Sequence, residues 1–165
     1  PIAQRKRCTN DDTTPKAAES APLAALVAGW SGLLPFIGSA GLYLLTAEER
    51  WLDVLRAYAA MIASFVGALQ WGYAVRDGLE GALAWRAYGW SVVPALAAWV
   101  ALLLPVQTGL PLLAATLLLC LVVDRAFARS RPGPAWLLPL RTALTLGGAA
   151  CLLGVLWPLP DLPGG

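Results

Sequence analysis

Few side chains in this sequence could do chemistry, and the most versatile type is missing. There is no histidine, and the three cysteines, Cys8, Cys120 and Cys151, are far apart and outside any C-x-x-C pair. Without imidazole a histidine-ligated haem, a histidine-containing zinc site and a Ser-His-Asp relay are all excluded. The cysteine spacing indicates neither a disulfide framework nor a metal knuckle. We therefore expect no catalytic residue, cofactor or metal, and a protein that is not an enzyme.

Gln70 is a polar side chain inside the apolar stretch SFVGALQWGY at 64–73. Small residues recur before and around it at helical spacing, in one row of Ala60, Ser64, Ala68 and Gly72 and a second row of Ala59, Ala63 and Gly67. In hydrocarbon, a face of small residues lets two helices approach closely. We interpret these residues as a helix-packing face, with Gln70 on its flank forming an interhelical hydrogen bond. A ligand-binding or proton-path role for Gln70 is the alternative.

Three charged residues, Asp124, Arg125 and Arg141, lie at the end of one apolar run and the start of the next. We interpret them as interfacial residues that anchor the helices and contact lipid headgroups or a partner loop, and Asp124 could pair with Arg141. A lipid-modifying enzyme working at this surface is the weaker alternative. Asp53 and Arg56, three residues apart, are expected to form a local helix pair.

The composition indicates that these residues sit in a membrane protein. Of the 165 residues 58% are hydrophobic and 13% charged, about half the charged fraction of a typical soluble domain. The charges leave four uncharged runs, at 20–47, 57–75, 87–123 and 142–160. Each is near or above the ~20 residues of one helical crossing, and the third is long enough for two.

We therefore predict an all-α integral membrane bundle of five transmembrane helices. The third run is divided at PVQTGLP, 105–111, where proline, glycine and polar residues favour a tight turn. The expected domains are a polar N-terminal arm over 1–20, a transmembrane domain over 21–158 and a C-terminal tail over 159–165. The expected spans are 22–46, 54–75, 88–105, 110–127 and 138–157.

Two local features are also expected. Pro35, between Gly32 and Gly38, should kink the first span near Leu34, because proline frees a backbone carbonyl. The segment at 76–88 is either an interfacial helix lying flat or a plain loop.

The distribution of cations predicts the orientation. With five spans, ten of the twelve Lys and Arg residues fall on the side of the N-terminus, and only Arg50 and Arg56 fall on the other. Because cytoplasmic-type loops carry the excess of Lys and Arg, the N-terminus is expected on the cytoplasm-like or matrix-like side.

Four separated runs resemble one family of membrane proteins. They are S-F-x-G-x-x-Q-W-G at 64–72, Y-x-W-S-V-x-P at 88–94, Asp124, and P-L-R-x-x-L-T at 139–145. In this order and spacing they are similar to the transmembrane protein 69 family, whose bacterial members are filed as domain of unknown function 3429. The resemblance covers about 22–157 and implies five helices in the bacterial plasma membrane or the mitochondrial inner membrane. It names no catalytic residue, and Gln70 stands where relatives often have histidine.

These observations favour a non-catalytic accessory or assembly subunit of a larger energy-transducing membrane complex, respiratory or photosynthetic. Its expected partners are membrane lipids and protein subunits, with no nucleic acid. The alternative is a small carrier or channel, for which Pro35, Pro94 and Gln70 would line the cavity.

Labelling of the two ends of the chain tests the topology. In sealed vesicles of one orientation, a membrane-impermeant reagent should reach one end from outside and the other only after permeabilisation, because an odd number of spans separates them. Ends that face the same compartment would contradict the five-span arrangement.

Overall fold

A computed structural model describes residues 21–130 and 134–157, which contain helices and turns and no strand. The helices are α1 (Leu23–Ser31), α2 (Leu34–Thr46), α3 (Arg50–Arg76), α4 (Gly81–Leu103), α5 (Val106–Ser130) and α6 (Leu137–Gly154). With α1 and α2 taken together, five segments are long and apolar enough to cross a membrane. The predicted all-α fold with five spans is confirmed. The expected arm over 1–20 and tail over 159–165 lie outside the described residues.

The first span is broken where a kink was expected. Helix α1 ends at Ser31 and α2 begins at Leu34, with Pro35 in its first turn. Proline suits this position, since the first amides of a helix have no intrahelical acceptor. The Tyr58 hydroxyl of α3 donates to the Gly32 carbonyl oxygen at 2.8 Å, so a neighbouring helix satisfies a polar group at the break.

Two other boundaries differ from the expectation. The segment at 76–88 is neither a loop nor a separate flat helix, because α4 already begins at Gly81 and only a short turn precedes it. The turn between α4 and α5 is shorter than the expected one: Leu104 is extended, and α5 starts at Val106 directly after Pro105. Both helices therefore continue into stretches whose proline, glycine or charged residues suggested irregular structure.

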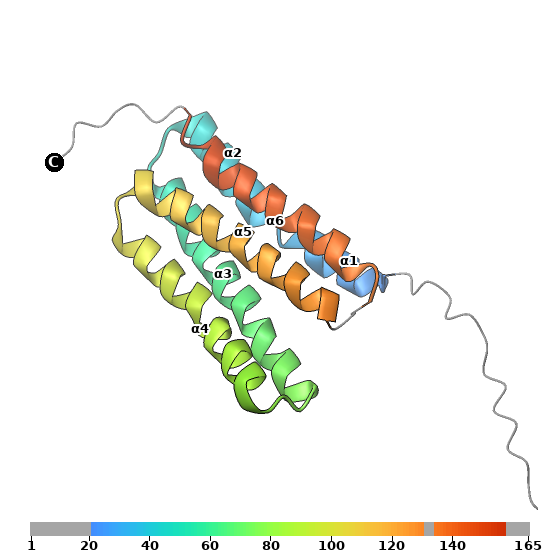
Figure 1. The fold of residues 1–165 in the computed structure, drawn as a ribbon. Coiled ribbons are helices and arrows are strands. Elements are labelled where there is room, and N and C mark those ends of the chain that lie inside the picture. Colours follow the sequence, from blue (N-terminus) through green and yellow to red (C-terminus); the bar gives the residue numbers. More distant parts are fainter. Residues whose placement is uncertain (1–20, 131–133, 158–165) are drawn as a thin grey trace, which may run out of the picture.

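The spans run up and down in a bundle with α3 and α5 at its centre (Figure 1). Helix α3 contacts α2, α4, α5 and α6, and α5 contacts α3, α4 and α6. The core between them combines large side chains with small ones: Leu55, Leu110, Leu113 and Leu152 are fully buried together with Ala59, Ala63 and Ala101. Alternating sizes let the helices pack closely without voids.

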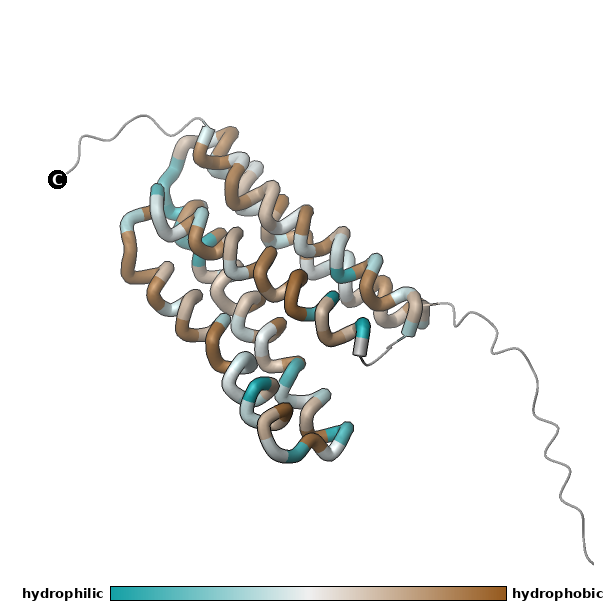
Figure 2. Tube along the Cα trace, in the orientation of Figure 1, coloured by the Kyte–Doolittle hydropathy of each residue, from teal (hydrophilic) through white to brown (hydrophobic). Residues whose placement is uncertain are grey.

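The outer surface of the bundle is apolar. Leu23, Leu45 and Trp85 each expose more than three quarters of their surface. Figure 2 shows the hydrophilic residues gathered toward the turns and helix ends, with hydrophobic residues along the middle of the helices. Exposure of such an apolar surface to water is unfavourable, whereas contact with lipid acyl chains is favourable.

Helices α3 and α4 meet through a glycine and a proline. A Cβ atom added to Gly67 would lie 2.8 Å from Pro94 Cγ and 3.0 Å from Pro94 Cβ. Pro94 lies inside α4 and is buried. The rigid pyrrolidine ring therefore fills the space left by the missing side chain of Gly67, and the two backbones come close together.

The end of α4 is held by Arg56, which also forms the expected helix pair with Asp53. Arg56 is buried, and its Nη2 lies 2.7–3.1 Å from the carbonyl oxygens of Ala101, Leu102 and Leu104. Asp53 is more distant, at 3.9 Å from Nη1, and its side chain is exposed. The last carbonyls of a helix have no intrahelical donor, so the guanidinium satisfies acceptors that Pro105, without an N–H, cannot.

Substitution of Gly67 by alanine should destabilise the bundle, because its methyl group would overlap the Pro94 ring. We expect the free energy of unfolding to fall by about 1–3 kcal/mol. Titration with a denaturing detergent, followed by tryptophan fluorescence, measures this change.

Gly72→Ala is the matched control on the same helix. Nothing lies within 4 Å of a Cβ added there. Alanine is the better helix former by up to about 1 kcal/mol, so this variant should be as stable as the parent or more stable. Equal effects of the two substitutions would contradict the packing described here.

Candidate functional site

The described helices enclose a cavity at the end of the bundle where α3 and α5 finish and α6 begins. Its volume is about 560 Å³, and its lining comes from the last turns of α3, the last turns of α5 and the segment 134–141. The lining is mostly apolar, with four charged side chains, Arg76, Asp77, Asp124 and Arg141. This end lies on the same side of the bundle as the start of α1, where most cations of the chain are expected.

Asp124 is the centre of the polar part of this cavity. Gln70 Nε2 of α3 donates to Asp124 Oδ1 at 2.8 Å, and Arg141 Nη2 of α6 donates to Asp124 Oδ2 at 2.5 Å. The side chains of Asp124 and Arg141 are only 15% and 14% exposed. One carboxylate of α5 thus joins three spans. The expected interhelical bond of Gln70 and the possible Asp124–Arg141 pair are the same network.

Arg125 lies beside this network without joining it. Its Nη2 donates to Thr142 Oγ1 of α6 at 3.1 Å, and the arginine is exposed. Thr142 in turn donates to the carbonyl oxygen of Leu138. Arg125 therefore adds a contact between α5 and α6 at the surface, and its contact with headgroups or a partner stays a prediction.

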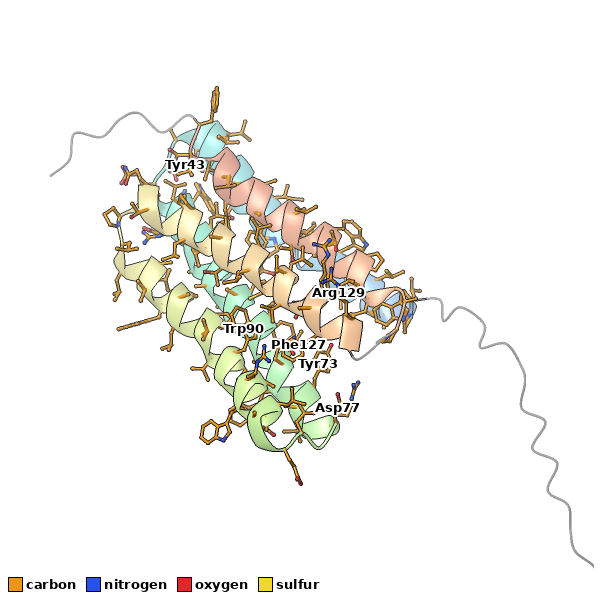
Figure 3. The ribbon with its side chains drawn as sticks, viewed as in Figure 1. Tyr43, Tyr73, Asp77, Trp90, Phe127 and Arg129 are labelled. Atoms are coloured by element: carbon orange, nitrogen blue, oxygen red, sulfur yellow. The ribbon has the colours of Figure 1, made fainter. Side chains whose placement is uncertain are left out.

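The mouth of the cavity carries a second ion pair and aromatic rings. Arg76 Nε lies 2.7 Å from Asp77 Oδ1, and the Arg76 guanidinium lies 5.3 Å from the centre of the Tyr73 ring. Tyr73, Phe127 and Trp136 line the cavity. In Figure 3, Tyr73 and Asp77 of α3 and Phe127 of α5 lie in the same region of the bundle. Apolar rings beside paired charges suit an amphiphilic molecule.

The structure divides the predicted helix-packing face. Ala60 and Gly67 are buried, and Ser64 is half-buried with its hydroxyl bonded to the carbonyl oxygen of Ala60. Ala68 and Gly72 are exposed instead. The row at the helix interface is thus the second one, Ala59, Ala63 and Gly67, continued by Gln70 and Ala74. None of the residues that the structure describes covers Ala68 or Gly72.

Within the described residues no group of three or more His, Cys, Asp or Glu side chains is placed to hold a metal ion. Cys120 and Cys151 are free thiols, and Cys8 lies outside the described residues. The described lining of the cavity offers hydrogen-bonding groups, ion pairs and aromatic surface.

Sequence reasoning missed the aromatic wall and the cavity. A signal was present: Gln70, Tyr73 and Asp77 recur at helical spacing on one face of α3, and Asp124 and Phe127 do so on α5. Read together, these two faces would have pointed to a shared pocket.

Comparison with known proteins gives two matches. The family model described as "Protein of unknown function (DUF3429)" matches residues 21–157. "Transmembrane protein 69" of Xenopus tropicalis is 34% identical over 147 residues, which cover 86% of this chain and 56% of the relative. The chain thus spans just over half the length of this relative. No solved structure matches the present chain.

Asp124→Asn and Arg141→Gln test the network through stability. Each single variant leaves a partly buried charge without its partner and should lower the free energy of unfolding by about 3 kcal/mol. The double variant removes both charges and should cost clearly less than the sum of the two. Denaturing-detergent titrations of the parent, the two single variants and the double variant complete this double-mutant cycle.

Arg125→Gln is the control from the next position of α5, and we expect a much smaller loss from it because Arg125 is exposed. Additive effects of Asp124→Asn and Arg141→Gln would show that the two side chains do not interact.

Proposed function

The chain belongs to the DUF3429 family, the family that includes transmembrane protein 69, and from this membership we propose that it is a non-catalytic accessory or assembly subunit of a larger membrane complex. That it is a multi-pass integral membrane protein follows from its five apolar spans. The proposal concerns what these spans do. We further propose that the complex is an energy-transducing one.

The outward face of α3 carries this proposal. Ala68 and Gly72 lie one turn apart and are exposed, and no described residue lies within 4 Å of a Cβ added to Gly72. Small residues facing lipid gain little dispersion from acyl chains, whereas a partner helix can approach them closely. Met61 and Phe65, exposed on the same helix, add larger side chains that a partner could pack against.

The use of the buried charges also favours a structural role. Asp124 accepts hydrogen bonds from two other helices, and Arg56 donates to three carbonyl oxygens. Groups held in this way stabilise the arrangement of the spans. A catalytic acid, base or nucleophile would instead face a substrate with its reactive atom unoccupied.

The proposed location is the mitochondrial inner membrane or the bacterial plasma membrane, in line with the family resemblance. The proposed partners are protein subunits and membrane lipids, and no nucleic acid. The cation-rich end of the bundle, with Arg76, Arg125 and Arg141, is proposed to face the matrix or cytoplasm.

A small carrier or channel is the second candidate, favoured by the cavity that opens at this end and reaches Gln70. Transport needs a polar path to the other side. Beyond Gln70 the described core is formed by side chains such as Leu55, Leu113 and Leu152, which are fully buried and apolar. This packing argues for the subunit rather than the carrier.

Purification from native membranes in mild detergent, followed by mass spectrometry of co-migrating proteins, tests the proposal. We expect a particle much heavier than the chain, containing further subunits. Gly72→Leu should reduce the recovery of these subunits several-fold, because its side chain would separate the two helices. A lone monomer would refute the proposal.

Gly38→Leu is the matched control. Gly38 is exposed on α2, and nothing lies within 4 Å of a Cβ added there. Neither leucine side chain would overlap a described residue at its Cβ, so both variants should fold. Only Gly72→Leu should lose its partners. Equal losses from both variants would remove α3 as the docking face.

A further inference from the structure

The cavity between α3, α5 and α6 has features of a binding site that go beyond a structural role in a complex. Its volume of about 560 Å³ is within the range of small-molecule sites. It lies at the end of the bundle where α3 and α5 finish and α6 begins, and its wall is largely apolar. A molecule that fits it has to be apolar over most of its surface and polar at one end.

Among the described lining residues the charges are balanced. Arg76 and Arg141 accompany Asp77 and Asp124, so these four described side chains sum to zero formal charge. A polyanion would need an excess of cations, and a cation an excess of carboxylates. A headgroup that carries one charge of each sign matches both halves of the lining.

The start of α6 provides a place for the negative half. No side chain caps this helix, and Trp136, Leu137 and Leu138 of its first turn line the cavity. The helix dipole places partial positive charge here, but the Leu137 N–H already donates to the Pro134 carbonyl oxygen and Pro139 has no N–H, so the donors for a phosphate are those of a side chain. Arg141, one turn further on, has a guanidinium with five N–H donors, of which Asp124 accepts one.

A second, smaller cavity lies next to this one. It has a volume of about 160 Å³ and an apolar lining that includes Gly32, Leu33, Phe36 and Leu144, and Arg141 lines both cavities. The larger cavity has charged side chains in a mostly apolar wall and the smaller one is almost entirely apolar, so together they match the two parts of a lipid, a headgroup and an acyl chain.

We propose that the two cavities together bind one glycerophospholipid with a zwitterionic headgroup. Its phosphate accepts hydrogen bonds from Arg141 and Arg76 near the start of α6. Its ammonium group lies toward the carboxylates of Asp77 and Asp124 and the aromatic side chains at the cavity mouth. Figure 3 shows Tyr73, Asp77 and Phe127 of this lining. Part of one acyl chain occupies the smaller cavity. The proposal does not depend on the accessory-subunit function, since a lone monomer could bind the same lipid.

Native mass spectrometry of the protein from nanodiscs tests this site. The nanodiscs contain phosphatidylethanolamine, phosphatidylcholine and phosphatidylglycerol in equal amounts. We expect one retained phospholipid, zwitterionic and several-fold enriched over phosphatidylglycerol. Preferential retention of phosphatidylglycerol, or of an isoprenoid quinone added in parallel, would overturn the proposal.

Two variants of α5 form a matched pair for the same measurement. Ala128 lines the larger cavity, whereas Ala126 is exposed and does not line it. Ala128→Phe should fill the cavity and reduce retention several-fold, and Ala126→Phe should leave it unchanged. Equal retention by both variants would overturn the site.

Arg76→Glu provides a second variant that does not depend on packing, because Arg76 is exposed at the mouth. The reversed charge repels the phosphate, so retention of the zwitterionic lipid should fall while the protein remains folded in the denaturing-detergent titration. Unchanged retention would count against the phosphate position. Displacement of the lipid by soluble glycerophosphoethanolamine as readily as by intact phospholipid would show that the acyl chain has no part in binding.

Discussion

Hydrocarbon offers no hydrogen bonds, and this constraint determines where the few polar side chains of the spans lie. Each has to find its partner within the bundle. Asp124 accepts donors from α3 and α6, and Arg56 donates to the carbonyl end of α4. In both cases the groups that need partners lie on different spans. The charges therefore fix which helices are neighbours.

Two glycines allow the backbones of neighbouring helices to pack closely. Gly67 receives the Pro94 ring, and a Cβ on Gly109 would lie 2.4 Å from the carbonyl oxygen of Ala101. Without side chains at these two positions, α4 can approach α3 along its length and α5 at its end. Arg56, whose Nη2 would lie 3.2 Å from the same added Cβ, reaches the carbonyls through this narrow contact.

The spans could be predicted from the sequence because a charge is costly in hydrocarbon, so uncharged runs of sufficient length indicate crossings. By the same rule the third span was expected to begin at residue 88, whereas α4 begins at Gly81. Arg86 and the residues around it lie in the first turns of the helix, where a long side chain can reach the interface. Helices continue past the point where the hydrocarbon ends, and the charge pattern does not mark that point.

The site was predictable in its residues more than in its geometry. The types of Gln70, Asp124 and Arg141 marked them as unusual in their surroundings, but their connection requires knowing that α5 lies between α3 and α6. The choice between the two small rows of α3 was also beyond the sequence. Both rows are compatible with a helix interface, and the shape of Pro94 on α4 selects the one that contains Gly67.

The break between Ser31 and Leu34 has a consequence for biogenesis. Helix α2 packs on α3, whereas α1 rests on α6, where Gly29 faces Leu140 and Leu144. Of the described helices α1 is made first and α6 last, so α1 gains its principal neighbour only after the other described helices have been made. Insertion of the span formed by α1 and α2 and completion of its packing are therefore separated by the synthesis of α3 to α6, and a nascent chain that stops before α6 would leave α1 without this neighbour.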